Sequence, residues 1–75
     1  MKSELRVIQF TEPDEHRGIY ECFFDDDGKP VSFASQPVVL KWTGGANAVL
    51  QKLEEIKNAI VYKKWYEPKD FGMPM

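Results

Sequence analysis

Three consecutive aspartates, Asp25 to Asp27, form a dense group of potential metal ligands in this chain. Carboxylate oxygens bind calcium, but a calcium loop of the helix–loop–helix kind needs ligands at alternating positions and a bidentate glutamate near about the twelfth position. Counted from Asp25, the fifth position is Lys29, whose charge opposes a cation. We interpret the run as a solvated acidic turn, with weak cation binding as the alternative, and we predict no metal and no cofactor.

The chain has one cysteine and one histidine, Cys22 and His16, which could in principle act as a nucleophile and its general base. Such a pair needs a third group to orient the histidine, and nothing in the sequence indicates one. Cys22 also lies in an apolar run that is typical of a strand, where a buried structural cysteine is expected. We therefore predict that the protein is not an enzyme and has no catalytic residue.

Lysines adjoin aromatic residues at two places, Lys41-Trp42 and Lys63-Lys64-Trp65-Tyr66. Tryptophan and tyrosine are enriched in protein–protein interfaces, and here they could also complete a small core. Aromatic rings flanked by lysines can alternatively stack nucleotide bases while the ammonium groups hold phosphates. A single-stranded nucleic-acid site is therefore the alternative function, with these candidate residues: Lys41, Lys63, Lys64, Trp65 and Tyr66.

Composition narrows the class of protein. The 75 residues suffice for one domain, residues 1–75, and a chain of this length buries only about 60% of its surface, which favours association with a partner or with itself. The formal net charge of −2 argues mildly against non-specific nucleic-acid binding. The polar first residues have no apolar run behind them, and no stretch reaches the ~20 apolar residues of a membrane span, so we predict a cytoplasmic protein without membrane contact.

Runs of apolar residues on both sides of the acidic turn predict antiparallel strands. We expect strands over 5–10, 19–24 and 30–35, with the turn at 25–29. In the second strand, Cys22 and Phe24 share a face with Tyr20, and Glu21 lies opposite. The charge of Glu21 makes the first of these faces the inner one. The run 38–42 is either a fourth strand or an extended crossing to the next element.

Apolar residues at positions 49, 53, 56 and 60 predict an amphipathic helix over 46–60. Thr43 is its expected N-terminal cap, and Gly44 and Gly45 allow a sharp entry into it. Residues 61–66 either prolong the helix or form a short closing strand. The prolines and the glycine that follow argue against regular structure, so we predict a mobile tail over about 67–75.

These elements predict an α+β fold with a three- or four-stranded antiparallel sheet and one helix packed on one face. Because one helix covers only one face, the other face would expose Ile19 and Phe23 unless a partner covers it. We therefore predict a non-catalytic protein-interaction module that contacts a protein partner, or a second copy of itself as a homodimer, through the uncovered face or an open strand edge. The candidate partner-binding residues are Ile19, Phe23, Trp42, Trp65 and Tyr66.

The order of elements from Tyr20 to Ile60 resembles the first half of HicB-type antitoxin domains, with a strand, an Asp-Asp-Asp-Gly turn, a Val-Ser-Phe strand, a proline, a strand, a Gly-Gly turn and an amphipathic helix. The chain is also similar to small uncharacterised bacterial and phage proteins with a tyrosine-rich strand and an Asp-x-x-Gly-Lys-Pro turn before one helix. The antitoxin resemblance implies binding of a toxin. It does not imply DNA binding, because the sequence contains no helix-turn-helix or ribbon-helix-helix segment.

Overall fold

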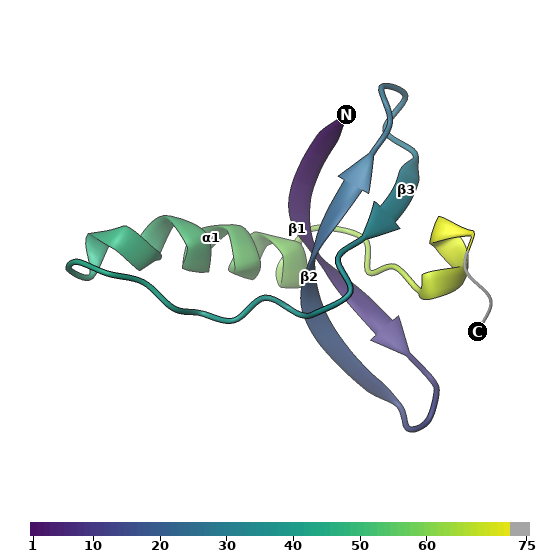
Figure 1. The fold of residues 1–75 in the computed structure, drawn as a ribbon, viewed down its shortest axis with the longest axis horizontal. Helices are drawn as coiled ribbons and strands as arrows, with labels where there is room; N and C mark the ends of the chain where they lie inside the picture. The colour runs from purple at the N-terminus through teal and green to yellow at the C-terminus, as the bar shows by residue number, and fades with distance from the viewer. Residues whose placement is uncertain (73–75) are drawn as a thin grey trace.

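The computed structural model describes residues 1–72, and its elements are β1 (Lys2–Phe10), β2 (His16–Phe24), β3 (Pro30–Phe33), α1 (Asn47–Val61) and the 3-10 helix η1 (Pro68–Phe71). The three strands form one antiparallel sheet in the order β1-β2-β3. The helix α1 meets the sheet from one side, and η1 lies on the other side (Figure 1). The predicted α+β class and the antiparallel sheet are confirmed.

The hairpin of β1 and β2 is longer than the sequence predicts. Its ladder runs from Lys2 opposite Phe24 to Phe10 opposite His16, so each strand begins with polar residues that the predicted ranges exclude. Apolar alternation marks only the half-buried part of a strand. Backbone pairing continues beyond it, because every residue supplies a donor and an acceptor.

The acidic turn joins β2 to β3, as the sequence predicts. The Asp25 carboxylate accepts hydrogen bonds from the backbone N–H groups of Asp27 and Lys29, each at 2.9 Å. Gly28 has a φ of 80°, a left-handed conformation that other residues rarely adopt. The first aspartate of the run therefore shapes the turn, which gives its carboxylate a structural role.

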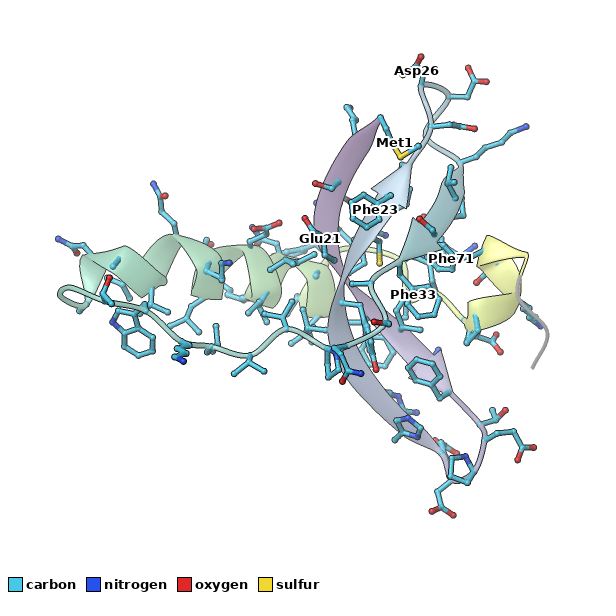
Figure 2. All side chains as sticks on the ribbon, viewed as in Figure 1. Met1, Glu21, Phe23, Asp26, Phe33 and Phe71 are labelled. Atoms are coloured by element: carbon cyan, nitrogen blue, oxygen red, sulfur yellow. The ribbon has the colours of Figure 1, made fainter. Side chains whose placement is uncertain are left out.

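One face of the sheet carries the core. It brings together Ile8 of β1, Cys22 and Phe24 of β2, and Phe33 of β3. Phe71 of η1 packs against this face, with its ring centroid 5.0 Å from that of Phe33 (Figure 2). The prediction that Cys22 and Phe24 point inward is confirmed.

The C-terminal segment covers the core face, and this corrects the predicted mobile tail for residues 67–72. Pro68 and Phe71 are buried, and the Asp70 carboxylate accepts a hydrogen bond from the backbone N–H of Glu67 at 2.8 Å. Proline suits the first turn of a helix, where its missing N–H would have no partner in any case. It therefore begins η1 rather than preventing regular structure. Residues 73–75 of the predicted tail lie outside the described residues.

Tyr66 pairs with the outer edge of β1. Its N–H donates to the Val7 carbonyl at 2.9 Å, and its carbonyl accepts from the Gln9 N–H at 2.7 Å. These bonds form a single parallel bridge, and α1 ends at Val61. Residues 61–66 therefore neither prolong the helix to residue 66 nor form a complete closing strand.

The predicted bounds of α1 agree with the structure to within one residue, but the predicted cap does not. Ala46 occupies the cap position, and no side chain accepts a hydrogen bond there, so Thr43 is not the cap. The run 38–42 is an extended crossing, because the sheet of the described chain has three strands. Only its first residue contacts the ladder, where the Val38 N–H donates to the Ile19 carbonyl at 2.7 Å.

The chain leaves the sheet after Val38 and returns to it through α1, so residues 39–61 form an arm that projects from the sheet (Figure 1). The C-terminal half of α1 contacts the sheet, where the Glu55 carboxylate accepts a hydrogen bond from the Leu5 N–H at 3.1 Å. Val49 lies near the opposite end of α1 and is nevertheless buried. The segment that leads from the sheet to α1 runs alongside the helix (Figure 1).

We predict that Phe71→Ala lowers the free energy of unfolding by about 3 kcal/mol, because it removes a buried ring and leaves a cavity between the C-terminal segment and the sheet. The measurement is urea denaturation followed by circular dichroism. Lys69→Ala, on the exposed side of the same short helix, is the control and should change stability by less than about 0.5 kcal/mol. Equal losses in the two variants would contradict the role of Phe71 in the core.

Candidate protein interface

The face opposite the core carries Ile19 and Phe23, and both side chains are half-buried. Their neighbours on β1, Leu5 and Val7, are buried, and Ile60 of α1 lines a common pocket with Val7 and Ile19. The end of α1 therefore covers part of this face. We predicted that the face with Ile19 and Phe23 is left uncovered, and the structure corrects this prediction. The helix covers part of that face, and the C-terminal segment lies on the opposite side of the sheet (Figure 1).

A shallow pocket lies where the arm joins the sheet. Its lining residues are Val7, Arg17, Gly18, Ile19, Ile60 and Trp65. The Arg17 guanidinium lies 5.6 Å from the centroid of the Trp65 ring, and the Trp65 indole N–H donates to the Ile60 carbonyl at 3.0 Å. The pocket measures about 240 Å³, which is below the ~300–1,000 Å³ of typical small-molecule sites. It suits a single side chain of a protein partner better than a small molecule.

The structure does not gather the five predicted partner-binding residues on one surface. Ile19 and Trp65 line the same pocket, and Phe23 lies on the same face of the sheet as Ile19. Trp42 lies on the arm and is exposed. Tyr66 packs against the core on the other face of the sheet.

The residues of the predicted nucleic-acid site are divided in a similar way. Lys41 lies between Val38, which still bonds to β2, and the start of α1, whereas Lys63 and Lys64 lie between the end of α1 and the bridge of Tyr66 to β1. The Lys63 ammonium binds the Glu4 carboxylate at 3.4 Å, and the Lys64 ammonium lies 5.3 Å from the centroid of the Tyr66 ring. That ring is half-buried against the core, so it offers no open platform for a base.

The arm carries most of the exposed apolar side chains. Of the eleven large hydrophobic residues that are exposed in the described chain, seven lie on the arm: Val39, Leu40, Trp42, Leu50, Leu53, Ile60 and Val61. We call the four members of this set on α1 the arm face: Leu50, Leu53, Ile60 and Val61. Successive helical residues are rotated by about 100°, so these four positions share one side of the helix.

The sequence did not reveal the arm face, because it predicted that one apolar side of the helix packs against the sheet. The structure buries Val49 and Ala59, but it exposes Leu53 and Ile60, which belong to the predicted inner side. Leu50 is the residue from which the arm face could have been predicted. It lies outside the predicted inner positions and gives the helix more apolar residues than one packed side requires.

The edges of the sheet are poor candidates for strand pairing. Tyr66 occupies the outer edge of β1, and the Leu5 N–H is bound by the Glu55 carboxylate. The other edge is β3, which spans four residues and begins with Pro30, a residue without an N–H donor. Short strands and prolines are common protections against edge pairing, so the predicted contact through an open strand edge has little support.

Cys22 and His16 do not form a catalytic pair. They lie six residues apart on β2, a spacing of about 20 Å in a strand. The exposed His16 ring stacks on Phe10 with centroids 4.8 Å apart, whereas Cys22 is fully buried. Burial raises the pKa of the Cys22 thiol to about 11, so the thiolate that a nucleophile requires is not formed near neutral pH.

A buried charge fastens the C-terminal segment to β1. The Arg6 guanidinium donates to the Lys64 carbonyl at 2.8 Å and to the Glu4 carboxylate at 2.7 Å, and it lies 4.8 Å from the centroid of the Tyr66 ring. Burial alone would raise the pKa of Glu4, but the hydrogen bond from Arg6 and the charge of Lys63 outweigh it. The pKa of Glu4 therefore lies below its ordinary value, and the carboxylate stays charged beside Arg6.

We predict that the Cys22 thiol resists alkylation in the folded protein and reacts after unfolding. Because its pKa rises from 9.0 to about 11 on folding, the unfolded chain loses this proton first as the pH increases. The neutral buried thiol therefore adds up to roughly 3 kcal/mol to the free energy of unfolding below about pH 9, and this stabilisation is lost as the pH rises towards 11. Urea denaturation at several alkaline pH values measures it, and Cys22→Ala should lack this part of the pH dependence. Equal alkylation rates in folded and unfolded protein would contradict the prediction.

Residues 1–72 contain neither a candidate metal site nor a candidate membrane-spanning helix. No group of three histidine, cysteine, aspartate or glutamate side chains in this range could hold a metal ion. Within the same range, no helix has the length and apolar character needed to cross a membrane.

No protein-family model matches the chain, and neither a curated protein nor a solved structure matches it.

Proposed function

We propose that this chain is a small non-catalytic protein-interaction module that binds its partner through the arm face. One observation carries the proposal: Leu50 and Leu53 are 52% and 40% exposed on a helix whose domain has only a small core. Complete burial of a leucine side chain contributes about 1.5–3 kcal/mol. The free chain leaves much of this stabilisation unused, and a partner that covers the arm face would supply it.

The dimensions of the chain support the same proposal. The radius of gyration is 13.1 Å, whereas a compact domain of 75 residues is expected to have a value of about 11.4 Å. The arm accounts for this difference, because it extends away from the sheet (Figure 1). Apolar side chains gathered on such a projection are typical of surfaces that another molecule covers.

The resemblance to HicB-type antitoxin domains makes a small toxin one candidate partner. The resemblance runs from Tyr20 to Ile60, which includes residues 39–60 of the arm. An arm face that binds a toxin would thus have three of its four residues, Leu50, Leu53 and Ile60, within the region of resemblance. A co-purifying small ribonuclease would favour this antitoxin-like role.

We predict that the double variant Leu50→Lys/Leu53→Lys loses its partner and remains folded, because neither side chain is buried in the core and lysine is well tolerated on a helix. The tagged chain is expressed together with an untagged copy in its host and captured from lysate. Mass spectrometry then identifies the proteins recovered with it. Recovery of a stoichiometric protein with the original chain and its loss with the double variant support the arm face. Circular dichroism checks the fold.

Val31→Lys is the matched control for this experiment. Val31 is 41% exposed, close to the value for Leu53, but it lies on β3 and not on the arm. The control should therefore retain the partner. If the control loses the partner and the double variant keeps it, binding belongs to the edge of the sheet and the proposed arm face is wrong.

A further inference from the structure

We infer that the partner of the arm face is a second copy of this chain, docked so that the two α1 helices pair antiparallel about a two-fold axis near residue 55. This inference rests on the proposed function and names the partner of the same surface. It follows from the exposed area of the chain, the spacing of residues on α1, the charge of the arm and the position of the pocket.

The exposed area of the chain fits the requirement of a dimer. A compact monomer of 8.7 kDa is expected to expose about 4,700 Å², whereas this chain exposes 5464 Å². The excess, about 750 Å², is close to the ~800 Å² that each partner loses in a standard protein interface. One isologous contact along the arm would thus remove the surface that the monomer leaves uncovered.

The positions on α1 are complementary to themselves. Rotation about an axis near residue 55 brings Leu50 of each copy opposite the partner's Ile60, and Leu53 opposite the partner's Lys57. The spacing between these residues is three, four and three, which is the spacing of helices that pair along their length. The line of contact between the two helices, which we call the seam, is therefore apolar at both ends. At its centre the aliphatic part of the Lys57 side chain can pack against the partner's Leu53.

The charges of the arm permit this contact. The Lys57 ammonium lies 3.9 Å from the Glu54 carboxylate in the same helix, so each lysine at the seam has a carboxylate one turn away in its own copy. The whole arm, residues 39–61, contains three lysines and two glutamates. Two nearly neutral arms repel each other little, whereas a strongly acidic or basic partner would find no matching field on this surface.

The pocket lies where the antiparallel arrangement needs it. Antiparallel pairing places the free end of each arm beside the base of the other arm, where Ile60 and Trp65 line the pocket. Segment 39–46 of the free end carries Trp42, an exposed aromatic side chain. The partner's Trp42 is therefore the side chain that the geometry directs towards this pocket.

Sedimentation velocity over a range of concentrations tests the inference on the intact chain. The expected mass is twice the 8.7 kDa of the monomer. Leu53→Lys should weaken the dimer at least about tenfold, because it places four lysines around the centre of the seam. Val31→Lys has nearly the same original exposure and should leave the dimer unchanged. A chain that stays monomeric at roughly 1 mM, or a dimer that only Val31→Lys dissociates, overturns the inference.

Disulfide cross-linking tests the orientation of the helices. Leu50→Cys and Ile60→Cys are prepared separately and mixed under mild oxidation, while the buried Cys22 stays unreactive and the unmodified chain serves as the control. Antiparallel pairing predicts a disulfide between the two different variants and little product from either alone. Efficient cross-linking of Leu50→Cys with itself would indicate parallel helices and overturn the antiparallel arrangement.

The two proposals fail in different ways. If the chain is monomeric but captures another protein that Leu50→Lys/Leu53→Lys no longer binds, the arm face is a protein-binding surface and the second copy is not its partner. If neither self-association nor capture depends on the arm residues, the proposed function fails as well. A dimer that Leu53→Lys dissociates supports both proposals.

Discussion

The backbone bridge between Tyr66 and the outer edge of β1 determines how the rest of this small domain is covered. Its two hydrogen bonds, to Val7 and Gln9, hold the C-terminal segment beside the sheet. The Arg6 guanidinium adds a third bond to the same segment through the Lys64 carbonyl. From this position the following residues cross the core face, and Phe71 reaches Phe33 (Figure 2).

The position of α1 is a consequence of this arrangement. Because η1 already covers the core face, the helix can meet the sheet only on the other side, and it does so with its C-terminal half (Figure 1). The first turns of α1 lie beyond the sheet, where Val49 is buried but Leu50 and Leu53 are exposed. The arm face therefore exists because only the C-terminal half of α1 packs on the sheet, while the rest of the helix projects away from it (Figure 1).

The arrangement that leaves the arm face exposed also limits the stability of the monomer. The core cluster consists of Ile8, Cys22, Phe24 and Phe71 with partly buried rings around it, and the other buried apolar residues of the described chain are Leu5, Val7, Val49 and Ala59. A domain with so little buried apolar surface is close to the lower limit of independent stability. Protected sheet edges leave the arm as the remaining surface that can bury apolar area in an assembly. Association through the arm would thus add stability that the monomer cannot obtain from its own chain.

The sequence alone determined the hairpin, its acidic turn, the inward direction of Cys22 and Phe24, and the bounds of α1 to within one residue. These features depend on alternation, helical spacing and turn chemistry, which act over a few neighbouring residues. Only the tertiary structure decided which segment covers which face. The sheet has apolar residues on both faces, so local pattern could not choose between α1 and the C-terminal segment as the cover for the core. That choice depends on contacts between distant parts of the chain, such as those of Tyr66 with β1, and it also decided which side of α1 stays exposed.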